Sequence, residues 1–145
     1  MRVFKLSFAG AIVSAAFLAA APAHAEMMKM AATLDGAQQV PPVETAGKGT
    51  AEVTFDTDTK MLEWTVEYSD MPEAPSAGHF HGPAAAGENA GVAIPFEGDL
   101  TSPIKGSATL TDAQAADLTA GRYYINLHTA AHPDGEIRGQ VEKGM

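Results

Sequence analysis

Two histidines separated by a single residue, His79 and His81, are the residues whose type and spacing could do chemistry. Alternate residues of a β-strand project from the same face, and the rise of about 3.3 Å per residue places their Cα atoms about 6.5 Å apart. Neutral imidazole is a common ligand of zinc and copper, and three such nitrogens leave one coordination position open. The spacing therefore predicts a pair of metal ligands that needs a third group from elsewhere in the chain.

Residues 123–141 predict a β-hairpin that would supply this third ligand. In residues 123–128 the odd positions are apolar or aromatic, so Asn126 and His128 share the opposite face. Residues 133–135, Pro-Asp-Gly, have the composition of a tight turn. If the strand of the histidine pair lies beside this hairpin, three imidazoles meet outside the core. Otherwise the histidines are polar residues of an exposed strand face.

The second strand of the predicted hairpin, residues 136–141, carries further polar groups. Its apolar residues are expected to face the core, and the outward positions are Glu136, Arg138 and Gln140. A salt bridge between Glu136 and Arg138 would account for this carboxylate without a metal. His132 lies in the turn between the strands, where it either reaches the same metal as a fourth ligand or faces solvent.

The start of the chain predicts a secretory signal peptide in residues 1–25. Basic residues precede a largely apolar stretch at 6–18, and Ala-His-Ala at 23–25 matches the small residues before a cleavage site. The apolar stretch is too short for a membrane anchor. We therefore expect residues 26–145 to form one periplasmic or secreted domain that is not inserted in a membrane.

The chain that remains after cleavage is strongly acidic and contains no cysteine. Without Arg2 and Lys5, 7 basic and 18 acidic residues give a net charge of −11. Such a surface repels phosphate backbones, so we expect no nucleic acid partner. The absence of cysteine excludes disulfides and thiolate ligands, which leaves histidine, aspartate, glutamate and methionine to bind a metal.

Three methionines offer a second group of metal ligands near the predicted cleavage site. Met27, Met28 and Met30 lie close together in the sequence, and the thioether is a soft ligand that suits copper(I). The alternative is that residues 26–30 form a frayed terminus in which the methionines are incidental.

Short alternating segments separated by glycine and proline predict an all-β fold. Residues 49–55 and 61–68 alternate around a polar bend and predict a β-hairpin. Residues 111–121 predict one short helix, because Thr111 and Gln114 can form a capping box at its start. Further strands are expected at residues 30–34, 92–96 and 107–110. We expect an antiparallel Greek-key β-sandwich with one short helix; a closed barrel is the alternative.

Four stretches of the sequence resemble the CHRD domain, which is named after the animal protein chordin and also occurs in exported bacterial proteins. The stretches are LDGAQQVPPV (34–43), GHFHGPAAAGENAGV (78–92), GSATLT (106–111) and YYINLHTAAHPDGEIRGQV (123–141). The resemblance covers nearly all of residues 30–142. It implies an exported β-sandwich module. It does not imply an activity common to the whole family.

The strand that contains the histidine pair is also similar to the copper-binding strand of Cu/Zn superoxide dismutases, which are β-sandwiches. This similarity implies His79, His81 and His128 as metal ligands, with His132 as a fourth. The chain lacks the further histidines of a separate zinc site and the cysteine pair that pins the loops of those enzymes. These two departures argue against dismutase activity.

Three hypotheses about function follow from the sequence. The first is an exported CHRD-type module that binds a transition metal through the four histidines, with copper favoured and zinc as the alternative. The second is a structural or interaction domain without a metal, in which an exposed sheet face docks a protein partner. The third is an enzyme of the superoxide dismutase type.

Overall fold

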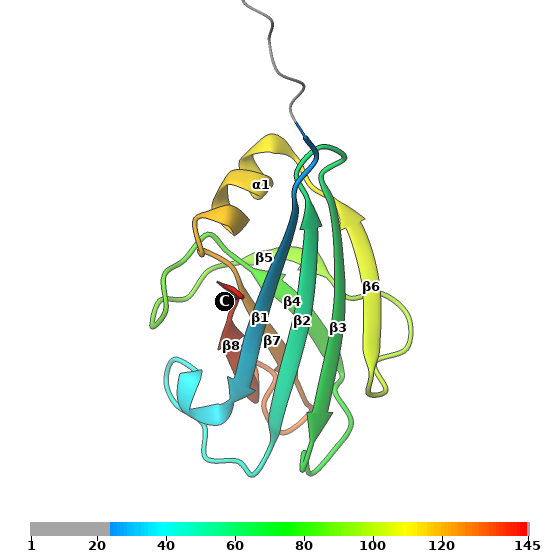
Figure 1. Ribbon diagram of the computed structural model, residues 1–145. Coiled ribbons are helices and arrows are strands. Elements are labelled where there is room, and N and C mark those ends of the chain that lie inside the picture. Colours follow the sequence, from blue (N-terminus) through cyan, green and yellow to red (C-terminus); the bar gives the residue numbers. More distant parts are fainter. Residues whose placement is uncertain (1–23, 145) are drawn as a thin grey trace, which may run out of the picture.

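The regular structure of the computed structural model, which describes residues 24–144, is almost entirely β-strand (Figure 1). The strands are β1 (Met27–Asp35), β2 (Lys48–Asp56), β3 (Met61–Ser69), β4 (Ala77–His81), β5 (Val92–Pro95), β6 (Ile104–Thr109), β7 (Tyr124–His128), β8 (Ile137–Gln140) and β9 (Glu142–Lys143). A 3-10 helix, η1 (Gly36–Gln38), follows β1, and the α-helix α1 (Asp112–Thr119) precedes β7. Residues 1–23 of the predicted signal peptide lie outside the described part, so its removal stays a prediction.

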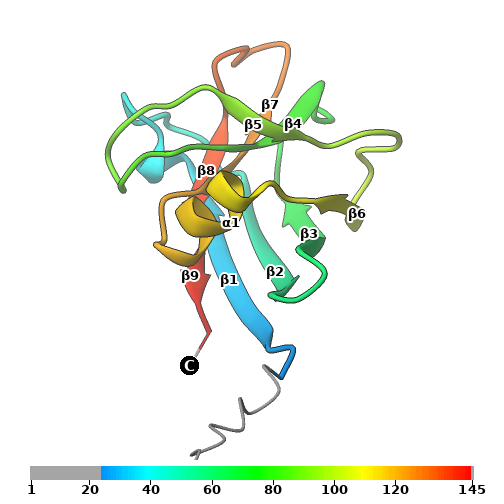
Figure 2. The ribbon, with the colours of Figure 1, turned by 90° about the horizontal axis from the view of Figure 1, so that it is seen from above.

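All of the described strands belong to one antiparallel sheet that bends over on itself. Its strand order is β5-β4-β7-β8-β1-β2-β3-β6, and β9 pairs with β1. Strands β1, β2, β3 and β6 form one layer, which faces a second layer that includes β4, β5 and β7 (Figure 2). The layers join where β8 meets β1, through a single pair formed by Asp35 and Arg138.

This topology confirms the predicted all-β sandwich. The chain returns from β6 through α1 to place β7 beside β4, which is the return connection of a Greek key. Within the described residues, no pairing joins β5 to β6, so the sheet is nearly closed but does not form a complete barrel.

An aromatic cluster holds the two layers together. The Trp64 ring on β3 lies edge-to-face with Phe80 on β4 and stacks on Phe96, which follows β5; both centroid distances are 5.2 Å. Such ring pairs stabilise a core beyond the area that they bury. Leu34 and Leu127, which are fully buried, extend this core along β1 and β7.

The predicted helix is confirmed, and it lies at one end of the sandwich (Figure 1). The Thr111 side chain accepts a hydrogen bond from the Gln114 backbone, and the Gln114 side chain accepts one from the Thr111 backbone. This capping box satisfies N–H groups that the first turn leaves unpaired. Leu118 is the buried residue through which α1 packs on the core.

The strand predicted at residues 107–110 begins earlier in the structure. The sequence did not indicate this start, because Gly106 interrupts the alternation of apolar and polar residues. In the structure β6 starts at Ile104, which is buried and pairs with Val66 on β3. Gly106 pairs with Trp64, and a Cβ atom at position 106 would overlap the Trp64 ring. Glycine is therefore required there for close packing, although it weakens the sequence pattern of a strand.

The frayed terminus considered for residues 26–30 is wrong, because β1 begins at Met27 and pairs with β2 along its whole length. Met30 belongs to the core and Met28 packs against it, whereas Met27 is 54% exposed. Strand alternation thus places Met27 on the opposite face from the other two methionines. The three thioethers do not form one group of ligands.

Strand β7 of the second layer is buried on both faces, which the alternation of its sequence does not indicate. All five residues of β7 are buried. Opposite the hydrophobic core, connecting segments cover a polar surface that we call the covered face. It consists of His79, His81, Tyr124, Asn126, His128, Glu136 and Arg138.

Glu136 and Arg138 show how the covered face is held. They were expected to face outward and to form a salt bridge, but they are 0% and 2% exposed, and the ion pairs of the described residues do not include them. The Glu136 carboxylate accepts hydrogen bonds from the hydroxyls of Thr45 at 2.7 Å and Thr129 at 2.6 Å. Backbone and hydroxyl partners from the loops have replaced the expected ion pair.

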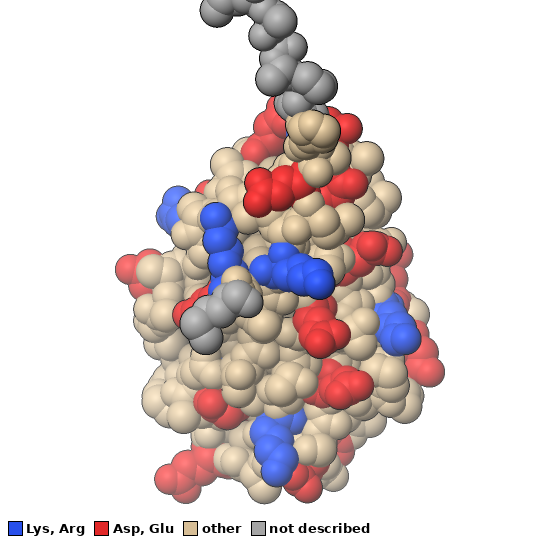
Figure 3. Space-filling view, viewed as in Figure 1, with Lys and Arg blue, Asp and Glu red and all other residues tan. Residues whose placement is uncertain are grey.

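Charged side chains of both signs are interspersed over the outer face of β1, β2 and β3 (Figure 3). Acidic residues outnumber basic ones by 18 to 9 in the whole chain. None of the helices among residues 24–144 has the length and apolar character needed to cross a bilayer.

We predict that replacing Leu127 with alanine lowers the free energy of unfolding by about 2–5 kcal/mol, because it leaves a cavity between the layers. Urea unfolding followed by Trp64 fluorescence measures this loss. Met61→Ala is a matched control on an exposed position of β3, with an expected change within about 0.5 kcal/mol. A larger loss for Met61→Ala than for Leu127→Ala would show that the strand faces are assigned the wrong way round.

Candidate metal centre

The pairing of β4 with β7 brings the predicted histidines together. In the antiparallel register Ala77 lies opposite His128, and His79 lies opposite Asn126. His79 and His128 are therefore diagonal neighbours on one face, within reach of each other's side chains. His81 follows on the same face of β4, because Phe80 between them points into the core.

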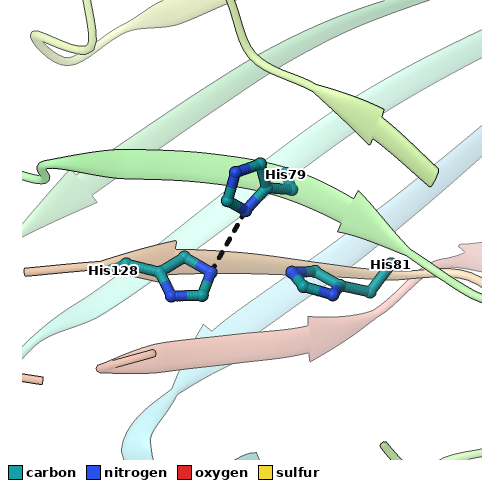
Figure 4. A group of neighbouring side chains, drawn as sticks. All are labelled: His79, His81 and His128. Atoms are coloured by element: carbon teal, nitrogen blue, oxygen red, sulfur yellow. Dashed lines mark hydrogen bonds between the residues drawn. The ribbon is translucent and has the colours of Figure 1, made fainter. Parts of the chain in front are cut away.

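The three imidazoles are turned toward one another (Figure 4). The His79 Nδ1 atom lies 3.2 Å from His128 Nε2, and one ligand atom from each of the three residues lies within 4.8 Å of the others. With metal–nitrogen bonds of 2.0–2.1 Å, neighbouring nitrogens of a tetrahedral site lie about 3.3 Å apart. The spacing of His79 and His128 thus fits two ligands of one metal ion.

Hydrogen bonds to backbone carbonyls orient two of the rings. Nδ1 of His81 lies 3.0 Å from the oxygen of Ala90, and Nδ1 of His128 lies 2.8 Å from the oxygen of Pro133. A carbonyl oxygen only accepts, so each Nδ1 carries the proton and each Nε2 presents a lone pair. Ligand histidines in metalloproteins are oriented by the same kind of hydrogen bond.

The interior of the cluster lacks a partner for one of these lone pairs. Nε2 of His81 is buried and has no hydrogen-bond partner among the described residues. Buried polar atoms are nearly always paired, and an unpaired one costs stability unless a water or an ion satisfies it. This atom is therefore a fitting ligand for a metal ion.

Burial also favours the neutral form of His79 and His81. It is the main cause that lowers the pKa of His81 below its ordinary value, and it lowers the pKa of His79, where the neighbouring His128 acts in the same direction. Only the neutral ring can donate a lone pair to a metal. The shifts of His79 and His81 thus favour the protonation state that metal binding requires.

His132, predicted as a fourth ligand, lies outside the group of three histidines. It is half-buried in the segment between β7 and β8. Its backbone N–H donates to the Thr129 hydroxyl at 3.2 Å, and its carbonyl accepts from the Gly135 N–H at 3.0 Å. These bonds give His132 a role in shaping the turn that carries Pro133.

The sequence analysis missed two residues beside the cluster. The Tyr124 ring stacks on His81 with an interplanar angle of 4° and a centroid distance of 5.0 Å. The Arg138 guanidinium carbon lies 3.5 Å from the centre of the same Tyr124 ring. Strand alternation could have placed Tyr124 on the face of His128, but nothing in the sequence indicates that Arg138 is buried beside it.

A family model described as the CHRD domain matches residues 30–141. The chain belongs to the CHRD domain family. This family supports a binding or structural module, and His79, His81 and His128 lie inside the matched range. Neither a curated protein nor a solved structure matches the chain. The similarity to superoxide dismutases therefore remains an expectation from the sequence.

We predict that the metal-free CHRD domain loses stability as the pH falls from 7 to 5. The ordinary pKa of histidine is 6.5, and the folded values of His79 and His81 are lower. Between the folded and unfolded values the unfolded chain binds more protons, so acidification through this window favours unfolding. Urea unfolding at pH 7, 6 and 5 in the presence of a chelator measures the effect.

His81→Asn is the matched variant for this measurement, because its side-chain amide can still donate to the Ala90 carbonyl but does not titrate. Its stability should depend less on pH than that of the unmodified protein. An identical pH dependence for both proteins would contradict the assignment of the effect to His81.

Proposed function

We propose that this CHRD domain binds one transition metal ion through His79, His81 and His128, with copper preferred over zinc. The observation that carries the proposal is the convergence of three imidazoles whose ligand atoms lie within 4.8 Å of one another. Two of the rings have their Nδ1 atoms bound to carbonyls and direct Nε2 into the cluster.

The alternative, that the three histidines are ordinary polar residues of an exposed strand face, explains the cluster less well. Such residues would be solvated, whereas His81 and His128 are buried. Placing three basic rings in contact also costs stability at low pH, and the orphaned Nε2 of His81 adds to this cost. A bound metal ion would offset both effects, because it accepts all three lone pairs.

The ligand set favours copper. Three neutral nitrogens suit both copper and zinc, and the affinity of such sites for divalent ions rises to a maximum at copper(II). The methionines of β1 give no support, because Met28 and Met30 pack in the core. Three protein ligands leave a coordination position for water or a small ligand. We assign no ligand role to His132.

The CHRD family is compatible with a second function, as a structural or protein-binding module without a metal. Secretion to the periplasm or the medium, expected from residues 1–25, suits either function. Metal uptake decides between them. Activity of the superoxide dismutase type would require copper binding first, and we do not propose it.

We predict that the untagged protein, residues 26–145, binds copper(II) with one ion per chain, and that His81→Ala abolishes this binding because it removes the deepest of the three ligands. Isothermal titration calorimetry against a competing chelator measures the affinity. His132→Ala is the control and should bind copper as the unmodified protein does. Circular dichroism establishes that each variant is folded. Histidine-independent uptake would contradict the proposal.

We also predict that copper raises the thermal stability of the protein. A ligand that binds only the folded state adds about 2.7 kcal/mol at a free concentration of 100 times its Kd. Thermal unfolding with and without copper should show this shift for the unmodified protein and for His132→Ala. His81→Ala should show none, and an equal shift in all three would indicate nonspecific binding.

A further inference from the structure

Arg138 brings a positive charge into the covered face and forms no ion pair with a carboxylate there. It is 2% exposed, and the ion pairs found among residues 24–144 do not include it. Its two hydrogen-bond acceptors are neutral: Nη1 donates to Asn89 Oδ1 at 2.9 Å, and Nη2 donates to the Glu88 backbone oxygen at 2.6 Å. The Glu136 carboxylate accepts from two hydroxyls instead.

The Arg138 charge lies close to the three histidines. The guanidinium carbon is 3.5 Å from the centre of the Tyr124 ring, and that centre is 5.0 Å from the centre of the His81 ring. The guanidinium carbon therefore lies no more than 8.5 Å from the His81 ring centre, the sum of these two distances. Protein atoms fill the space between them, so solvent ions screen the interaction little.

A buried positive charge at this range distinguishes the oxidation states of a bound metal. It repels a divalent ion about twice as strongly as a monovalent one. An imidazole that binds a metal is a neutral ligand and cannot compensate this repulsion, and a guanidinium stays protonated at any physiological pH. Imidazole nitrogens bind copper in both states, so the charge has two states to act on.

We propose that Arg138 sets the redox preference of the copper site, and that its buried charge favours copper(I) over copper(II). This inference rests on the proposed function, because it needs copper in the cluster. It assigns Arg138 an electrostatic role through space and not a place among the ligands.

Arg138 also has a positioning role that any test must separate from its charge. It donates to the Glu88 backbone oxygen and to the Asn89 side chain, next to Ala90. The Ala90 carbonyl accepts hydrogen bonds from Nδ1 of His81 at 3.0 Å and from the Tyr124 hydroxyl at 3.1 Å. Removing Arg138 would therefore change both the local charge and the orientation of His81.

Asn89→Asp separates the two roles. Asn89 is exposed, and its Oδ1 atom already accepts from Arg138. Aspartate keeps the shape and the oxygen that accepts from Arg138, and the guanidinium gains a balancing negative charge. It loses the hydrogen bond that Asn89 Nδ2 donates to the Val40 backbone oxygen at 3.0 Å, so the test also needs a spectroscopic check that His81 still binds the metal. Ala85→Asp adds the same charge at another exposed position of this loop and is the matched control.

The experiment measures the affinities of the untagged protein for copper(I) and copper(II) by competition with chelators. In Asn89→Asp the preference for copper(I) should fall about tenfold, which corresponds to a reduction potential about 59 mV lower. Arg138→Gln should change the preference in the same direction, and Ala85→Asp should leave it unchanged. Electron paramagnetic resonance of the copper(II) forms should show the same nitrogen ligands in the unmodified protein and in Asn89→Asp.

Each result decides one of the two ideas. If the unmodified protein takes up no copper, the proposed function fails and this inference fails with it. If copper binds and Asn89→Asp retains the preference of the unmodified protein, the inference fails and the proposed function stands. Equal shifts in Asn89→Asp and Ala85→Asp would also overturn it, because any added charge would then have the effect.

Discussion

The hydrogen-bonded pairing of β4 with β7 is the constraint on which the rest of this structure depends. Its inner face contributes Phe80, Ile125 and Leu127 to the core between the layers. Its outer face places His79 and His128 on a diagonal, 3.2 Å apart at their nearest ring nitrogens. The contacts that fold the protein therefore also position the imidazoles, and a shift of one residue in the register would separate both sets at once.

The covered face shows how a polar surface can be buried without ion pairs. Backbone carbonyls of the loops accept from His81, His128 and Arg138, and threonine hydroxyls donate to Glu136. Each of these bonds satisfies a group that would otherwise lose its hydration without compensation. The orphaned Nε2 of His81 departs from this rule, and such departures are expected where a protein binds a ligand.

The charges of this protein act at two different ranges. The excess of acidic residues lies on a surface where salt screens each charge within about 10 Å, so it influences solubility and encounters with other molecules. Arg138 is a single charge, but it is buried beside the Tyr124 ring and the histidine cluster. The positions of the buried Arg138 and Glu136 side chains, not the net charge, determine the electrostatics of the covered face.

The sequence by itself determined the local features: the alternating strands, the capped helix, the CHRD family and the common face of His79 and His81. The strands, the helix and the common face follow from side-chain periodicity and from backbone preferences, which act over a few residues. The family follows from the resemblance of whole stretches of sequence. Only the tertiary structure decided that His128 lies beside this pair, that Arg138 and Glu136 are buried without pairing, and that Met30 is a core residue. Strand pairing and the covering of one face by loops join residues far apart in the chain, and no local pattern encodes which segments will meet.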